Sequence, residues 1–173
     1  LILPTVLVLK DSSWVPEQRF PGALWNLLKI ITVFTVAHSI TLALAALGLL
    51  DVPSRLVESV IALSIVLVAL NNIFGKVREG SLLIILCLGL FHGLGFASVM
   101  GHLPIRVESL LKGVVGFNIG VELGQAAIVA VVFPVLFLLR NPPLYVPVVL
   151  KGGSAVLIVV AGVWFVQRAF GLA

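Results

Sequence analysis

Long apolar stretches separated by short polar connections dominate this chain. Five of them approach or exceed the roughly 20 residues that a helix needs to cross the hydrocarbon core of a bilayer. Glycine, proline and charged residues, which end helices, bound each stretch. The expected spans are 28–50, 56–74, 81–100, 113–139 and 148–170. The pattern therefore predicts an all-α, polytopic bundle of transmembrane helices that forms a single domain over residues 1–173.

The first nine residues, LILPTVLVL, are also apolar but too short to cross a membrane. We interpret residues 1–9 as the tail of a further, upstream span whose beginning is truncated from this sequence. A polar connection with Trp14 and Trp25 follows, and tryptophan favours the membrane–water interface. The predicted architecture is thus five full spans and the end of a sixth.

The composition supports this interpretation. Hydrophobic residues make up 61% of the chain and charged residues 10%, whereas soluble domains carry about 25% charged residues. The net charge of +4 comes from basic residues at span ends, where lipid headgroups explain them. The expected partner is therefore the lipid bilayer, and nucleic acid is not expected. The single cysteine, Cys87, lies in an apolar run and cannot form an intramolecular disulfide.

The basic residues also predict an orientation. The side that holds residues 10–29, 75–80 and 140–151 carries seven Lys and Arg residues, and the other side carries four. Cytoplasmic loops are enriched in Lys and Arg. We therefore expect the richer side to be cytoplasmic and the C-terminus to face the periplasm or the exterior.

Ionisable side chains occur inside three of the predicted spans. His38 lies near the middle of the first span, His92 in the third, and Glu122 is the one charge within residues 113–139. A lone polar group of this kind costs several kcal/mol in hydrocarbon, which is about the usual penalty for an unsatisfied polar atom. Imidazole and carboxylate suit divalent first-row metals. We therefore predict that these three residues meet at one intramembrane metal site.

Further polar residues are candidates to support that site. Asn118 and Gln125 share a helical face with Glu122, within about 60°. Asn71 belongs to the second span, and Glu58 lies near the start of that span. Amides orient ligands by hydrogen bonding, but they also join helices without any metal. Both interpretations remain open at this stage, as does a simple bridging role for each histidine.

Glycine forms a second stripe along the fourth span. Gly116, Gly120 and Gly124 recur every fourth residue, roughly opposite the polar face. Small residues in this spacing allow the backbone of another helix to approach closely. The fourth span is thus expected to pack on two sides.

Four segments of the chain resemble the HupE/UreJ family of bacterial membrane proteins. They are TVFTVAHSITLALAALG (32–48), VESVIALSIVLVALNN (57–72), LFHGLGFAS (90–98) and FNIGVELGQ (117–125). Members are hydrogenase or urease accessory proteins, proposed to carry nickel or a related divalent metal. The resemblance implies an inner-membrane metal transporter with Ni²⁺ as cargo. The family's motifs fall here on His38, Glu58, Asn71, His92, Asn118, Glu122 and Gln125. The family's earlier helix, with a His and an Asp-His pair, has no match in this sequence.

Three functions are compatible with these residues. The first is a permease for a divalent ion, Ni²⁺ in particular, that uses a site of His, Glu and Asn. The second is an intramembrane hydrolase that holds Zn²⁺, with Glu58 or Glu122 as general base. The third is a non-catalytic subunit, in which polar residues only specify packing within a homo-oligomer or a larger membrane complex. The sequence contains no P-loop, HExxH or GxSxG motif that would indicate another chemistry.

Overall fold

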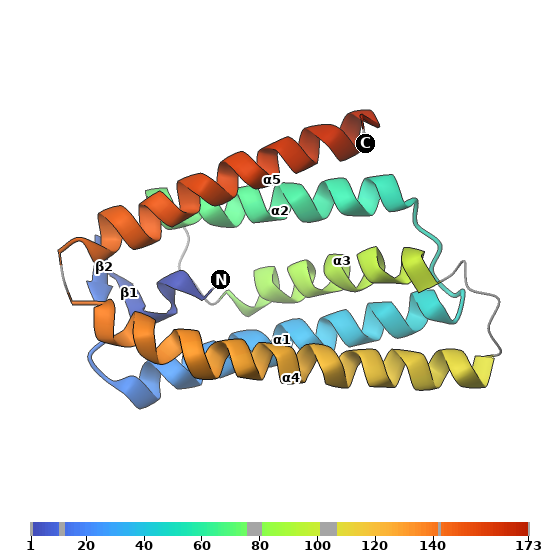
Figure 1. Ribbon diagram of the computed structural model, residues 1–173, viewed down its shortest axis with the longest axis horizontal. Coiled ribbons are helices and arrows are strands. Elements are labelled where there is room, and N and C mark those ends of the chain that lie inside the picture. The colour runs from blue at the N-terminus through green and yellow to red at the C-terminus, as the bar shows by residue number, and fades with distance from the viewer. Residues whose placement is uncertain (1, 11–12, 76–80, 101–106, 142, 173) are drawn as a thin grey trace.

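The computed structural model describes residues 2–10, 13–75, 81–100, 107–141 and 143–172, with the backbone alone at 96–100 and 107–111. Within these residues the chain forms five α-helices that run along one long direction (Figure 1). They are α1 (Phe20–Ala46), α2 (Ser54–Phe74), α3 (Leu82–Met100), α4 (Val107–Leu139) and α5 (Gly153–Phe170). The predicted all-α helix bundle is thereby confirmed.

In the part of the chain that the structure describes, four helical segments are long and apolar enough to cross a membrane. They are α1, α2, residues Lys112–Leu139 of α4, and Tyr145–Phe170, in which the π-helix η2 (Tyr145–Gly152) leads into α5. The part of α3 whose side chains the structure describes, Leu82–Gly95, is a shorter apolar helix. Helix α1 begins earlier than expected, at Phe20, because Pro21 suits the first turn of a helix, where no intrahelical N–H is needed.

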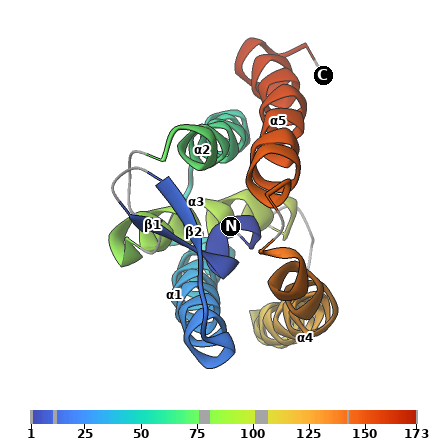
Figure 2. The ribbon, with the colours of Figure 1, turned by 90° about the vertical axis from the view of Figure 1, so that its left-hand side faces the viewer.

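The N-terminal residues differ from the expected helical tail. Leu3–Val6 form the 3-10 helix η1, and Leu7–Lys10 (β1) pair antiparallel with Ser13–Pro16 (β2). Pro4 has no N–H to donate in a continuing helix. Figure 2 shows this hairpin lying across one end of the bundle. The described part of residues 1–9 is therefore a plug at the bundle end.

The largest apolar core lies beneath this plug. Tyr145 is almost fully buried, and its hydroxyl donates a hydrogen bond of 2.8 Å to the carbonyl oxygen of Leu3. The indole Nε1 of Trp14 donates to the carbonyl of Asn72, 3.0 Å away. The buried members come from η1, β1, α1, α4 and η2: Val6, Leu7, Ala23, Leu27, Phe133, Leu136, Tyr145 and Leu150. This end of the bundle is thereby fixed by both apolar packing and hydrogen bonds.

Helices α1 and α3 approach each other very closely, and two glycines of α3 make this approach possible. A Cβ at Gly89 would lie 2.6 Å from the carbonyl oxygen of Phe34. A Cβ at Gly93 would overlap both Thr41 Oγ1 and the carbonyl oxygen of His38. Side-chain-free positions four residues apart let helix backbones touch, as is common in membrane bundles.

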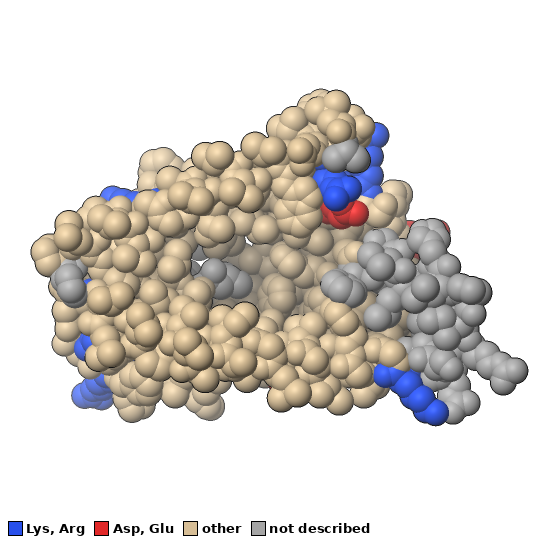
Figure 3. All heavy atoms as spheres, viewed as in Figure 1, with Lys and Arg blue, Asp and Glu red and all other residues tan. Residues whose placement is uncertain are grey.

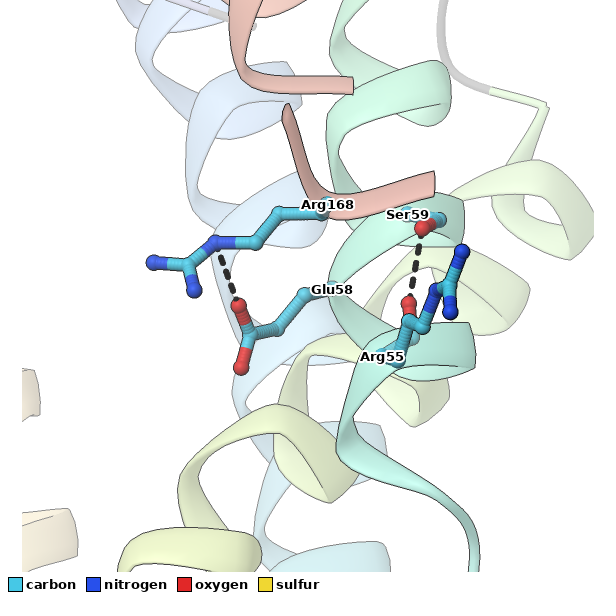
Figure 4. A network of polar contacts seen from close by, with 4 residues as sticks. All are labelled: Arg55, Glu58, Ser59 and Arg168. Carbon is cyan, nitrogen blue, oxygen red and sulfur yellow. Dashed lines mark hydrogen bonds and ion pairs between the residues drawn. The ribbon is translucent and has the colours of Figure 1, made fainter. Parts of the chain in front are cut away.

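Helices α2 and α5 run antiparallel and are joined by polar contacts at both ends. At the plugged end, Asn72 Nδ2 donates to Ser154 Oγ at 3.1 Å. At the other end, Arg168 Nε lies 2.8 Å from Glu58 Oε2 (Figure 4). Arg55 donates from Nε and Nη2 to the carbonyl of Ala169, near the end of α5, where carbonyls lack helical partners.

Charged side chains concentrate at the ends of the bundle. On the face seen in Figure 3, the described Lys, Arg, Asp and Glu residues lie toward the two ends, and the middle is uncharged. Three of the basic residues counted for the predicted orientation lie outside the described residues: Lys76 and Arg78 on the richer side and Arg106 on the other. The uncharged middle matches the hydrocarbon core of a bilayer.

The glycine contacts give a matched pair of substitutions. We expect Gly93→Ala to destabilise the folded protein by about 1–3 kcal/mol, since the added methyl group must displace α1. Gly120→Ala is the control, because a Cβ there meets no described atom within 4 Å. Unfolding followed in detergent would measure both. Equal effects of the two substitutions would contradict the close α1–α3 contact.

Candidate functional site

His38 is a buried imidazole without a visible partner. It lies on α1, and only 8% of its surface is exposed. Neither ring nitrogen has a hydrogen-bond partner among the described residues. Burying an unsatisfied polar group costs about 1–3 kcal/mol. Native proteins tolerate this cost mainly where the group has a role, such as binding a ligand. His38 is therefore the strongest single indication of a site.

His92 lies on α3, and its ring is held in a defined orientation. Its Nδ1 is 2.8 Å from the carbonyl oxygen of Leu88, one turn earlier in the same helix. A carbonyl can only accept, so Nδ1 carries the proton in this contact. The lone pair of a neutral imidazole then resides on Nε2, the nitrogen available to a metal.

Phe34 brings the two histidines into one environment. Its ring centroid is 6.2 Å from that of His38, nearly parallel, and 5.2 Å from that of His92, edge to face. The ring of Phe117 on α4 covers His38 from another side, at 6.4 Å. The close α1–α3 contact thus places both histidines in aromatic surroundings.

A cavity of about 310 Å³ opens beside His92. Its polar lining comes from His92, Ser64 and Asn72, and its apolar lining includes Phe34 and Leu157. Ser64 donates to the carbonyl of Ile61 in its own helix, at 2.7 Å. The cavity therefore offers space for an ion with part of its hydration shell next to the free Nε2 of His92.

The polar face of α4 meets α1 through two side-chain hydrogen bonds. Ser39 Oγ donates to Asn118 Oδ1 at 3.0 Å, and Thr35 Oγ1 donates to Gln125 Oε1 at 3.2 Å. Asn118 and Gln125 therefore join two helices, as their helix-joining interpretation predicts. The sequence analysis did not identify Thr35 and Ser39 as their partners, although both lie on one face of α1.

Glu122 lies between these two amides along α4, but it is exposed. Within the described residues, no group of three His, Cys, Asp or Glu side chains is arranged to hold a metal. The structure thus places His38 and His92 against the same ring, that of Phe34, whereas Glu122 is exposed. The three-residue metal site remains a prediction.

The remaining predicted residues fall in different places. Glu58 takes part in the ion pair with Arg168 at the bundle end. Asn71 is half-buried, whereas its neighbour Asn72 is buried and lines the cavity. The sequence pattern did not single out Asn72. Asn72 follows Ile65 by seven residues and Val68 by four, and this spacing places it on the same face of α2 as these two other lining residues.

A comparison with protein families shows to which family this chain belongs. A family profile described as HupE / UreJ protein matches residues 1–168. The chain belongs to the HupE/UreJ family. No curated protein and no solved structure matches it in the corresponding comparisons.

Membership of the HupE/UreJ family implies an accessory membrane protein connected with nickel or cobalt. The apolar helices agree with this, so the chain is an integral membrane protein. Membership of this family thus relates the protein to a divalent metal. The imidazoles of His38 and His92 are ligands of a type that binds such metals.

The α1–α4 hydrogen bonds can be tested by a double-mutant cycle. We expect Ser39→Ala and Asn118→Ala to show a coupling energy of about 0.6 kcal/mol, the average for such bonds inside membranes. Unfolding in detergent of the wild type, both single variants and the double variant provides the measurement. Pairing Ser39→Ala with Gln125→Ala, which share no bond, gives the control. Strictly additive effects for Ser39 and Asn118 would show that the bond does not form.

Proposed function

We propose that this protein is a membrane permease for a divalent metal ion, with Ni²⁺ as the expected cargo. The observation that carries the proposal is that His38 and His92, from neighbouring helices, both contact the ring of Phe34, and that Phe34 and His92 line a cavity within the membrane-spanning part of the bundle. Family membership supports a metal as the cargo. The Zn²⁺ hydrolase and the non-catalytic subunit lack a comparable observation in their favour.

The histidines are suited to transient binding. His92 presents Nε2 because Leu88 fixes its Nδ1, and His38 has two nitrogens without described partners. Imidazole binds nickel and zinc well. Two neutral ligands replace only part of the hydration shell, so the ion keeps water and can leave again, as conduction requires.

Glu122 supplies the negative charge for the pathway. It is the one ionisable group between Gly113 and Leu139, and a carboxylate exposed to hydrocarbon would be costly. An aqueous pathway along α4 removes this cost, and the carboxylate then attracts the cation toward the histidines. In this proposal Asn118 and Gln125 fix α4 against α1 and do not bind the ion.

The histidine pair is tested by metal accumulation in cells that express the protein. We expect the wild type to raise cellular Ni²⁺, measured by elemental analysis, and His92→Ala to abolish the increase. Cys87→Ala is the matched control, because this exposed thiol on α3 is also a metal ligand by type but does not line the cavity. Equal accumulation by wild type and His92→Ala would refute the proposal.

The role of Glu122 predicts a distinct phenotype. We expect Glu122→Gln to lower the rate of Ni²⁺ uptake most strongly at low external Ni²⁺, because attraction of the cation is lost while the histidine ligands remain. Uptake measured over a range of Ni²⁺ concentrations separates this from a loss of maximal rate. An unchanged concentration dependence would remove Glu122 from the pathway.

A further inference from the structure

A second cavity, larger than the one beside His92, lies at the plugged end of the bundle. Its volume is about 500 Å³, within the range of ligand pockets. The hairpin forms one wall through residues such as Val8 and Trp14. Helix α1 contributes Asn26 and Lys29, and the start of α3 contributes Ser81. The cavity therefore combines an apolar wall with hydrogen-bonding groups and one cation.

The charge around this cavity is positive. Lys29 is its one charged lining residue among those the structure describes, and no acidic residue lines it there. Among the described residues, the same end of the bundle holds one acidic side chain, Glu17, and five basic ones: Lys10, Arg19, Lys29, Arg140 and Lys151. The carboxylate of Glu17 already accepts from the backbone N–H of Arg19. An anionic ligand therefore fits this cavity, and a cationic one does not.

The position of the cavity identifies the ligand more closely. Lys29 Nζ lies 5.5 Å from the ring centroid of Trp25. Trp25 has 61% of its surface exposed, and exposed tryptophan marks the membrane–water interface. Lys29 is nine residues inside α1, and its long apolar stem allows the ammonium group to extend toward the headgroup level. Leu28 and Leu82 are also exposed beside the cavity and offer an apolar surface for acyl chains.

We propose that this cavity binds the phosphate headgroup of an anionic phospholipid, held by Lys29 with Asn26 and Ser81 as hydrogen-bonding partners. The site lies on the side predicted to be cytoplasmic, where anionic lipids attract basic residues. A free phosphate ion shares the recognised chemistry, but it would leave the exposed apolar surface beside the cavity unused. The proposal is independent of metal transport.

The test uses the purified full chain and native mass spectrometry. Samples are prepared with phosphatidylcholine alone or with phosphatidylglycerol added, and the retained lipid is counted for the wild type and three variants. We expect preferential retention of phosphatidylglycerol by the wild type and about a fivefold loss of that preference in Lys29→Ala, from the usual contribution of one cation near a lipid surface. Lys29→Arg keeps the charge and should keep the preference.

Lys151→Ala is the matched control, since Lys151 is an exposed cation at the same end that does not line the cavity. Equal losses in Lys151→Ala and Lys29→Ala would mean that general surface charge, not the cavity, selects the lipid, and would overturn the proposal. Inorganic phosphate is added in a parallel arm. Displacement of phosphatidylglycerol by inorganic phosphate would assign the cavity to a free anion and overturn the lipid assignment.

Discussion

The close contact between α1 and α3 is the constraint on which the rest of this structure depends. Gly89 and Gly93 leave no side chain between the two backbones, so the carbonyls of Phe34 and His38 lie against α3 directly. His92 is the residue before Gly93, and its ring therefore emerges at the edge of this contact beside Phe34. Any larger residue at Gly93 would separate the helices and with them the two imidazoles.

Polar groups in the remaining helix pairs find partners, and this contrast makes His38 informative. Ser39 and Thr35 bond to α4, and Asn72 bonds to Ser154 of α5. In hydrocarbon there is no water to satisfy a lone group, so such pairs form wherever packing permits. His38 is more buried than Thr35 and Ser39, yet it has no described partner. Among the described side chains, a buried imidazole with both nitrogens unpaired is thus unusual, and the proposed transient binding of a metal ion would account for it.

The sequence was sufficient for the helices because hydrophobicity and length act locally. Partner choice depends on helix rotation and crossing, which local patterns leave free: the sequence favoured Asn71 for the site, whereas Asn72 faces the cavity. The expected convergence of His38, His92 and Glu122 likewise depends on the rotation of three helices, and it remains a prediction. The hairpin of residues 7–16 was missed because apolar residues before a short polar turn also resemble the end of a helix.

The arrangement of charge separates binding from attraction. Two neutral imidazoles cannot offset the double charge of a metal ion in surroundings of low dielectric constant, formed here by Phe34 and Phe117. A carboxylate in direct contact would offset it, but strong pairing would also slow release. In the proposed pathway, Glu122 at a distance would lower the energy of the ion along its path without holding it. A site whose acid lies apart from its histidines is therefore better suited to passing an ion on than to storing it.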